Sequence, residues 1–371
     1  FNYFIMKKKL RPVAIYLPQF YPTPENDEWW GMGFTEWTNV AKARPRFVGH
    51  YQPHLPADLG FYDLRVAETR DLQAKMAQEY GISAFCYYHY WFNGKRILER
   101  PVEEILEAGK PDFPFMLCWA NENWTRGWSN RPNDILLKQD YSLEDDKKHI
   151  TYLLSVFKDP RYLRINNKPV IAIYRSTLIP DVSATLELWR NEAKREGLEL
   201  YICRFESYGV CGPEYLHDGF DAAIEFQPHA TKTNTYMKNR NIFPRLINKL
   251  TRRYLKKDVL PIILSYRSYV EYMCKQSQPV YKRYPCVMPS WDNSSRKKGN
   301  FLAFKKSTPF LYYKWLKHVV DNFIPFSKEE NLIFINAWNE WAEGDHLEPD
   351  QKWGRAYLEM TKKAVQDENI I

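Results

Sequence analysis

The sequence predicts an α/β fold in which eight parallel strands and their helices close into a (β/α)8 TIM barrel. Two observations support this prediction. Short apolar runs rich in β-branched and aromatic residues alternate with longer amphipathic runs of helical periodicity. Nearly every apolar run is followed by polar or aromatic residues, as expected at the open end of a barrel. A doubly wound open sheet is the alternative, but residues 18–22 read PQFYP after the first strand and contain no glycine-rich phosphate turn.

The expected elements alternate along the chain. The strands are expected at 13–17, 82–88, 115–119, 170–174, 200–203, 222–226, 286–289 and 332–336. Helices are expected at 64–80, 101–108, 143–157, 183–196, 266–276, 309–322 and 355–366. Ser142 and Thr308 precede two of them as typical N-caps. Two long insertions, 18–63 after the first strand and 229–261 after the sixth, are expected to form lids or binding loops.

Length and composition narrow the class of protein. Residues 12–371 are expected to form a single barrel domain, preceded by a short leader at 1–11 in which Met6 precedes three lysines. No apolar run is long enough to span a membrane, so we expect a cytoplasmic location. The net charge of +8 is modest for 371 residues and predicts no nucleic-acid partner. The oligomeric state is left open.

Cysteine and aromatic content bear on the kind of site. The six cysteines form no CxxC pair, so neither a disulfide framework nor a zinc site is expected, and no cofactor is implied. Aromatic residues make up 16% of the chain, with 13 Trp and 26 Tyr. Core packing explains such a content as well as a carbohydrate site does, because Tyr and Trp combine an apolar face with a polar group.

The most specific chemical signal lies near the C-terminus, where residues 334–344 read FINAWNEWAEG. Glycosidic-bond chemistry needs two carboxyl groups, one protonated and one ionised. Glu340 and Glu343 are three residues apart, and on one helical turn they would face the same way. Their mutual repulsion and the neighbouring indoles should raise the pKa of one carboxyl, making it the acid. The alternative is a helix cap at Glu340 and a surface charge at Glu343.

Other candidates come from the ends of the predicted strands and from the first insertion. The expected substrate-binding residues are Gln19, Trp37, His89, Tyr90, Trp91, Asn121, Glu122, Trp124, Gln227, Trp291, Asp292, Trp338, Asn339 and Trp341. Glu122 is a third candidate carboxylate, with a structural hydrogen-bonding role as the alternative. His89 is more often a core or hydroxyl-binding histidine than a catalyst, and the segment around Trp37 is either a subsite wall or a structural loop.

Two further segments were considered for binding. His346 lies near Asp345 and Glu348, but this spacing matches no strong ligand pattern, so we expect an exposed loop and no metal. The segment from Met237 to Lys257 is basic, with apolar residues at helical spacing. We favour an insertion helix that packs its apolar stripe on the barrel, and keep weak contact with an anionic membrane surface as the alternative.

Several long motifs resemble the WbsX group of bacterial proteins, which is similar to glycoside hydrolase family 99. They are AIYLPQF at 14–20, GFTEWTNV at 33–40, CYYHYWF at 86–92, CWANENW at 118–124 and NAWNEW at 336–341. The resemblance covers nearly the whole chain and implies a role in bacterial surface polysaccharides such as O-antigen or capsule. Family 99 consists of retaining endo-α-mannosidases and mannanases. Carried onto this sequence, its motif implies that Glu340 is the base acting on the sugar 2-hydroxyl. Glu343 would be the acid/base at the leaving oxygen, with a 1,2-anhydro sugar between the two steps.

These observations together predict a metal-independent, retaining glycoside hydrolase that acts on an α-linked, mannose-like bacterial polysaccharide. A glycosyltransferase or transglycosylase that builds such a polymer is the alternative, although the chain has neither an Asp-x-Asp motif nor a phosphate-binding glycine loop. A non-catalytic polysaccharide-binding module is the third possibility, and it would keep the aromatic residues without using the paired acids.

Overall fold

The computed structural model describes residues 10–126, 131–238, 240, 242–255, 259–297 and 299–366. Residues 1–9, most of the expected leader, lie outside this part of the chain, as do Lys256 and Lys257 of the basic segment. No helix in the described ranges is both long and apolar enough to cross a bilayer.

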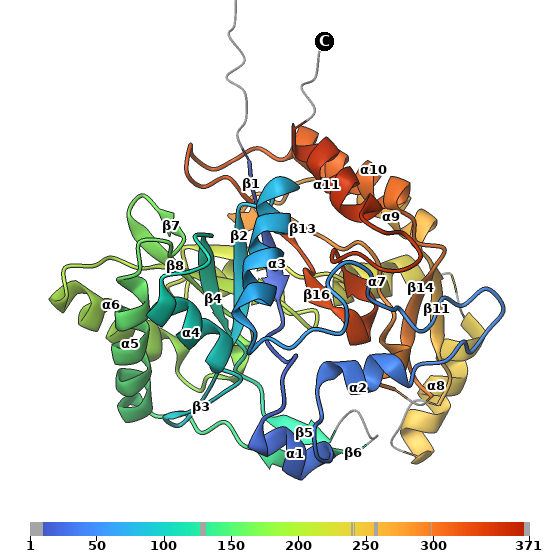
Figure 1. Cartoon of the computed structure of the whole chain (residues 1–371), viewed down its shortest axis with the longest axis horizontal. Coiled ribbons are helices and arrows are strands. Elements are labelled where there is room, and N and C mark those ends of the chain that lie inside the picture. Colours follow the sequence, from blue (N-terminus) through green and yellow to red (C-terminus); the bar gives the residue numbers. More distant parts are fainter. Residues whose placement is uncertain are drawn as a thin grey trace, which may run out of the picture.

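The central sheet is a parallel barrel (Figure 1). Its strands are β1 (Arg11–Tyr16), β2 (Ala84–Phe92), β4 (Phe115–Trp119), β8 (Lys168–Ile173), β9 (Tyr201–Glu206), β10 (Ala222–Glu225), β12 (Arg283–Tyr284), β13 (Cys286–Val287) and β15 (Leu332–Ile335). The hydrogen-bonded order is β12-β10-β9-β8-β4-β2-β1-β15-β13. Only Pro285 separates β12 from β13, so the two ends of this path are one continuous segment and the sheet closes on itself.

The barrel confirms the predicted fold class and modifies one predicted strand. The seventh strand begins earlier than the expected 286–289 and is split, because β12 pairs with β10 while β13 pairs with β15. Pro285 has no N–H to donate to the ladder, but its carbonyl accepts a hydrogen bond from the Phe334 amide at 2.8 Å. The split therefore lets one short segment join both neighbours.

Seven helices correspond to the predicted ones. They are α3 (Ala67–Glu79), α4 (Arg100–Ala108), α5 (Leu143–Phe157), α6 (Val182–Arg195), α9 (Tyr266–Met273), α10 (Pro309–Asn322) and α11 (Ala356–Gln366). The expected caps are present: Ser142 accepts from the Asp145 amide and Thr308 from the Leu311 amide. Between β9 and β10 the only helix among the described residues is the short 3-10 helix η3 (Pro213–Leu216).

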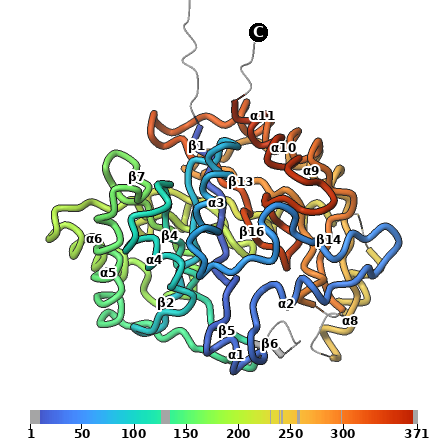
Figure 2. The backbone as a smooth tube through the Cα atoms, viewed as in Figure 1, coloured from blue at the N-terminus to red at the C-terminus, as the bar shows by residue number. Residues whose placement is uncertain are grey.

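The two insertions carry helices of their own. Residues 18–63 contain α1 (Pro24–Trp30) and α2 (Glu36–Ala41), and residues 229–261 contain α7 (Ala230–Met237) and α8 (Ile242–Leu255). Figure 2 shows β1 beginning at the top of the view, with α1, α2 and α8 gathered at the lower side. The insertions therefore surround the end of the barrel where the parallel strands finish.

Short strand pairs complete the fold around the barrel. They are β3 (Lys95–Ile97) on β2, β7 (Arg164–Ile165) on β8, β5 (Trp124–Arg126) with β6 (Arg131–Leu137), β11 (Ile262–Ser265) with β14 (Leu302–Lys305), and β16 (Asn339–Glu340) with β17 (Asp345–His346). The last of these pairs holds the carboxylate motif.

The alternation of side chains along β2 decides which of its residues reach the barrel interior. All nine residues of β2 are buried. Tyr88 lies against Tyr174, which follows β8, and Tyr90 lies against Trp124 of β5. His89 instead contacts His149 of α5, on the outside of the barrel. Because neighbouring side chains in a strand point to opposite faces, two tyrosines face the barrel mouth and the histidine faces a helix.

Candidate active site

The carboxylate motif forms a tight hairpin at the end of β15. Glu340 is the last residue of β16, and Glu343 ends the single 3-10 turn η5 (Trp341–Glu343). The predicted helical turn is therefore a 3-10 turn inside a hairpin. Gly344 ends that turn at φ 58°, and a Cβ there would lie 3.0 Å from Cβ of Asp292. Both the left-handed backbone and this close approach favour glycine at this position.

A buried arginine joins three carboxylates in this region. Arg296 follows the short 3-10 helix η4 (Asn293–Ser295), and its side chain is only 9% exposed. Its Nη2 donates to Oε2 of Glu340 at 2.9 Å, its Nη1 lies 2.7 Å from Oε1 of Glu343, and its Nε donates to Oε1 of Glu36 at 2.9 Å. One planar guanidinium thus holds the two predicted acids side by side and adds a third from α2.

The electrostatics of this cluster favour retention of a proton. Burial raises the pKa of Glu340 to about 8, and Arg296 opposes the rise while Glu343 and Glu36 add to it. Burial also raises the pKa of Glu343, again against the effect of Arg296. The Glu340 side chain is 7% exposed and the Glu343 side chain 20%. We therefore expect the proton of this pair to reside on Glu340, with ionised Glu343 facing Arg296.

Tyrosines and a further ion pair surround the acids. Glu340 helps to raise the pKa of Tyr88 and of Tyr90, after burial, so both hydroxyls lie within its electrostatic reach. At the other side, Arg175 Nη1 contacts Oε1 of Glu122 at 2.6 Å, and burial raises the pKa of this carboxyl. The predicted residue Glu122 is thus part of an ion pair at the mouth of the barrel.

An exposed tyrosine stands beside this ion pair. Tyr208 follows β9, is 62% exposed and has φ 53°, a left-handed conformation that is uncommon for a bulky side chain. The Arg175 guanidinium lies 4.1 Å from its ring centroid. Burial of its hydroxyl raises the pKa of Tyr208, and the charges of Glu122 and Glu343 add to the rise. A flat ring held here is well placed to contact a sugar that reaches Glu343.

Two predicted site residues lie away from the acids. His89 Nε2 and His149 Nε2 of α5 are 2.9 Å apart, and the Trp91 indole donates to Oδ2 of Asp145 of α5 at 3.0 Å. Both predicted residues therefore pack between the barrel and α5 and do not line its mouth. The physical reason is the alternation of β2, which makes Tyr90 the predicted residue that faces inward.

The tryptophans of the motif do not present faces to a sugar. Trp338 is fully buried, with its ring 5.1 Å from that of Phe85. Trp341 is 2% exposed and stacks on His346 with centroids 3.7 Å apart, while its indole donates to Oε2 of Glu348 at 2.6 Å. They instead exclude water behind the acids. Accessible aromatic area near the mouth comes from the exposed Tyr208 and the half-buried Trp124.

Several predicted polar residues tie loops together. Asn121 accepts from the Arg175 amide at 2.8 Å and donates to the Arg175 carbonyl, which positions the ion pair. Asn339 accepts from the Leu17 amide at 2.8 Å and donates to the Leu17 carbonyl at 3.1 Å. Gln227 is fully buried and accepts from the Tyr269 hydroxyl at 3.1 Å.

The predicted residues of the first insertion support the cluster from behind. The Gln19 carbonyl accepts from the Glu36 amide at 3.0 Å, which places the acid that binds Arg296. Trp37 is 8% exposed, donates to the Tyr62 carbonyl at 2.8 Å and packs against Trp341. This segment is therefore packed structure beside the site, in which Glu36 contributes to the charged cluster.

The remaining predicted residues, Trp291 and Asp292, line a separate cavity. Its volume is about 130 Å³, and His50, His54, His346 and Lys352 also line it. Asp292 accepts from Gln52 Nε2 at 2.8 Å and contacts His50 Nε2 at 2.5 Å, while its amide donates to the Glu343 carbonyl at 2.5 Å. This cavity therefore adjoins the acid-bearing turn without being lined by Glu340 or Glu343.

The same cavity contains residues that could hold a metal ion. Single ligand atoms of His54, His346 and Asp350 all lie within 4.8 Å of one another, and all three residues are buried. Burial lowers the pKa of both histidines, which keeps them neutral as ligands would be. His346 is 4% exposed, so the expected exposed loop is wrong. His54 and His346 are far apart in the sequence, and only the fold brings them together. Glu206, Cys211 and His229 form a second such group.

Four residues that the sequence did not place in the site are central to it: Arg296, Glu36, Arg175 and Tyr208. Glu36 and Arg175 lie in segments that were already noted, one in a motif and one at a strand end. Arg296 follows the candidates Trp291 and Asp292 in the same loop. An arginine near predicted acids is a usable signal, but nothing in the spacing pairs residue 296 with residues 36 and 340.

Comparison with known proteins agrees with the barrel. Residues 12–361 match the family described as Glycosyltransferase WbsX. The chain is 40% identical over 355 residues to an uncharacterised protein, WxcX, of Xanthomonas campestris pv. campestris (strain ATCC 33913), covering 95% of this chain and 49% of that protein. The protein of strain B100 matches to the same extent. The chain thus spans about half the length of these curated relatives.

Solved structures with the same fold include sugar-acting enzymes. A protein described as glycoside hydrolase-like superposes with a TM-score of 0.61 at 14% identity, covering 99% of this chain and 97% of that one. The GH99 endo-alpha-mannosidase of Bacteroides thetaiotaomicron superposes with a TM-score of 0.55 at 14% identity, covering 96% of each chain. At this level of identity the likeness concerns the fold.

Proposed function

The chain belongs to the WbsX family, and from that premise we propose that it cleaves glycosidic bonds in an α-linked, mannose-like bacterial polysaccharide. The observation that supports this most is the pair Glu340 and Glu343 on the buried guanidinium of Arg296, at the end of the barrel where such active sites lie. Two coupled carboxyls that share about one proton can supply an acid and a base at the same sugar. The barrel shared with a GH99 endo-alpha-mannosidase agrees with this choice of substrate.

The proposed reaction has two steps and retains the anomeric configuration. In the first, ionised Glu340 removes the proton of the sugar 2-hydroxyl while O2 attacks C1. The bond from C1 to the leaving oxygen breaks, and that oxygen takes the proton of Glu343. In the second, Glu343 removes a proton from water as the water oxygen attacks C1. The C1–O2 bond then opens, and Glu340 returns its proton to O2.

The proton distribution of the folded protein is opposite to that starting state. Burial places the proton on Glu340, whereas the proposed first step begins with the proton on Glu343. A transfer of this proton from Glu340 to Glu343 leaves the total charge beside Arg296 unchanged. We propose that the proton moves to Glu343 when the sugar 2-hydroxyl binds beside Glu340.

A panel of bacterial surface polysaccharides tests the proposed activity. Wild-type protein, Glu340→Gln and Glu343→Gln are incubated with each glycan, and NMR follows the anomers of the products. We expect release with retention for the wild type, and a loss of at least about 100-fold for each variant. Full turnover by both variants would overturn the assignment. Equal glycan binding by all three proteins with no cleavage would identify a binding module.

Aryl glycosides with a good leaving group separate the two roles. A variant that lacks the acid keeps turnover on an activated substrate, because that leaving oxygen needs no proton. We therefore expect Glu343→Gln to cleave a nitrophenyl glycoside of the cleaved sugar while Glu340→Gln does not. Rescue of Glu340→Gln alone would reverse the two roles, in agreement with the proton that burial keeps on Glu340.

A transferase is the second candidate, because the family description is Glycosyltransferase WbsX. The same acid and base could pass a sugar to a hydroxyl of a growing polymer in place of water. Consumption of a sugar nucleotide with polymer growth, measured in the same NMR experiment, would favour this candidate. Release of free sugar or shorter glycan without an added donor would favour hydrolysis.

A further inference from the structure

Positive charge is concentrated in the second insertion. Residues 226–257 contain nine Lys or Arg and no Asp or Glu, whereas the net charge of the whole chain is +8. The rest of the sequence is therefore close to neutral. Such a local excess produces a field that attracts an anionic surface, and its effect falls off within a Debye length.

The apolar side of α8 is uncovered. Most of its large apolar side chains are more than half exposed: Ile242 58%, Phe243 70%, Leu246 55%, Leu250 56%, Tyr254 73% and Leu255 58%, whereas Ile247 is half-buried. We call the six exposed residues the α8 apolar face. The expectation that the stripe packs on the barrel is therefore wrong. The contact inward is made mainly by Asn248, which accepts from the amides of Val259 and Leu260 at 3.0 and 2.9 Å.

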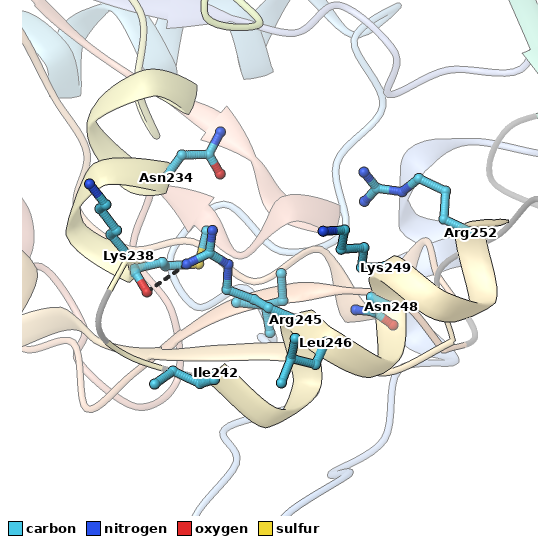
Figure 3. A pocket seen from close by; sticks show the side chains of 10 residues that line it. Asn234, Lys238, Ile242, Arg245, Leu246, Asn248, Lys249 and Arg252 are labelled. Atoms are coloured by element: carbon cyan, nitrogen blue, oxygen red, sulfur yellow. Dashed lines mark hydrogen bonds between the residues drawn. The ribbon is translucent and has the colours of Figure 1, made fainter.

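A basic cavity lies beside this face. Its volume is about 540 Å³, and it is lined by Asn234, Met237, Lys238, Ile242, Arg245, Leu246, Asn248, Lys249, Arg252 and Ile262, with no acidic residue among them. Figure 3 shows Arg245, Lys249 and Arg252 extending from the same side of α8 toward Asn234 of α7. Arg245 also donates to the Met237 carbonyl at 2.9 Å, which links α8 to the end of α7.

We propose that α7 and α8 dock the protein on an anionic lipid bilayer, with the α8 apolar face entering the interface and the basic cavity receiving lipid headgroup phosphates. Charge complementarity argues for this occupant, since phosphate is the anion that several Lys and Arg side chains around one cavity bind. The exposed Phe243 and Tyr254 suit the boundary between headgroups and acyl chains. A second protein copy would bring the same positive charge to the face and would be repelled.

Docking here would direct the active-site mouth toward the membrane. Figure 1 places α8 at the lower right and α2 at the lower middle of the view, both on the side away from the start of β1. Glu36 of α2 is one of the carboxylates on Arg296, so this side of the molecule also carries the acid cluster. The docking proposal can be tested independently of the proposed reaction, because vesicle binding requires no catalytic turnover.

Co-sedimentation with vesicles tests the proposal in the whole 371-residue chain. One set of vesicles is phosphatidylcholine alone, and the other also contains phosphatidylglycerol. We expect binding to the anionic vesicles that weakens with salt. Lys249→Gln and Arg253→Gln should each lower it about fivefold. Phe243→Ser combined with Leu246→Ser should lower it at least about tenfold.

Matched controls use exposed apolar residues elsewhere. Leu72→Ser on α3 and Phe310→Ser on α10 remove side chains that are 54% and 66% exposed, and should leave vesicle binding unchanged. Circular dichroism of all variants checks that they are folded. Loss of binding in folded α8 variants with binding kept in the controls supports the proposal.

Three outcomes would overturn the proposal. The first is equal binding to both vesicle types, or none to either. The second is that calorimetry shows binding of inorganic phosphate while the protein does not bind anionic vesicles. The cavity would then be a site for a free anion. The third is a dimer in analytical ultracentrifugation that is lost in the Phe243→Ser, Leu246→Ser variant without vesicle binding, which would assign the face to a second copy.

Discussion

Replacing Glu340 with glutamine tests whether burial keeps a proton on this carboxyl. Its pKa rises from 4.5 to about 8 in the folded protein, so between these values the folded state binds more protons than the unfolded state. Stability then falls as pH rises through this window. Glutamine has nearly the same shape and cannot ionise. The variant should therefore match the wild type near pH 5 and become progressively more stable relative to it toward pH 9.

The magnitude follows from the width of the window. Each pH unit contributes about 1.4 kcal/mol, so the rise to about 8 corresponds to at most about 5 kcal/mol for full ionisation. This pKa already includes the opposing effect of Arg296, so the bond from Arg296 to the carboxyl is not subtracted again. We therefore expect a net stabilisation of several kcal/mol, at most about 5 kcal/mol, at pH 9, in a variant that has lost its activity.

Urea unfolding followed by circular dichroism at pH 5, 7 and 9 measures the effect. Glu107→Gln, at an exposed position of α4, is the matched control and should change the unfolding free energy by no more than about 0.5 kcal/mol. A Glu340→Gln protein that is no more stable than wild type at pH 9, or a difference independent of pH, would refute the argument that burial dominates Arg296 at this carboxyl.

Three further predictions concern the neighbours of the acids. Arg296→Met removes the cation shared by three carboxylates and should cost about 3–5 kcal/mol of unfolding free energy at pH 7. Burial raises the pKa of Glu343, so the loss should be smaller at pH 5 as this carboxyl takes up a proton, and equal losses in urea unfolding at both pH values would contradict this. Tyr208→Ala should lower kcat/KM on the cleaved glycan about tenfold, while Tyr208→Phe keeps the ring and should stay near wild type. The unfolding midpoints of both variants should be unchanged, because the ring is exposed. Unchanged kinetics in both variants would show that Tyr208 does not contact the substrate. Trp91→Phe loses the hydrogen bond from the indole to Asp145 and should lower the unfolding free energy by about 1–3 kcal/mol without changing KM. A raised KM would show that Trp91 contacts the substrate.

Local sequence patterns were sufficient to predict most strands and helices of the barrel. Apolar runs and amphipathic periods located the eight strands and seven helices, because both depend on the chain immediately around them. The same signals were weaker for the seventh strand, where Pro285 divides the pairing between two neighbours. They failed for α8, whose apolar period is real but whose burial depends on whether another surface covers it.

Within the site, the sequence by itself determined the two acids, since Glu340 and Glu343 are close in the chain and lie beside tryptophans. It also determined that polar and aromatic residues follow the strands. Only the tertiary structure decided which of them face the acids, because the pleat of β2 turns Tyr90 inward and His89 and Trp91 outward. It alone joined Glu36, Arg296 and Glu340, which are far apart in the chain, into one buried cluster. The physical reason is that side-chain chemistry is local to the sequence, whereas burial and charge pairing, which set each pKa, are properties of the folded molecule.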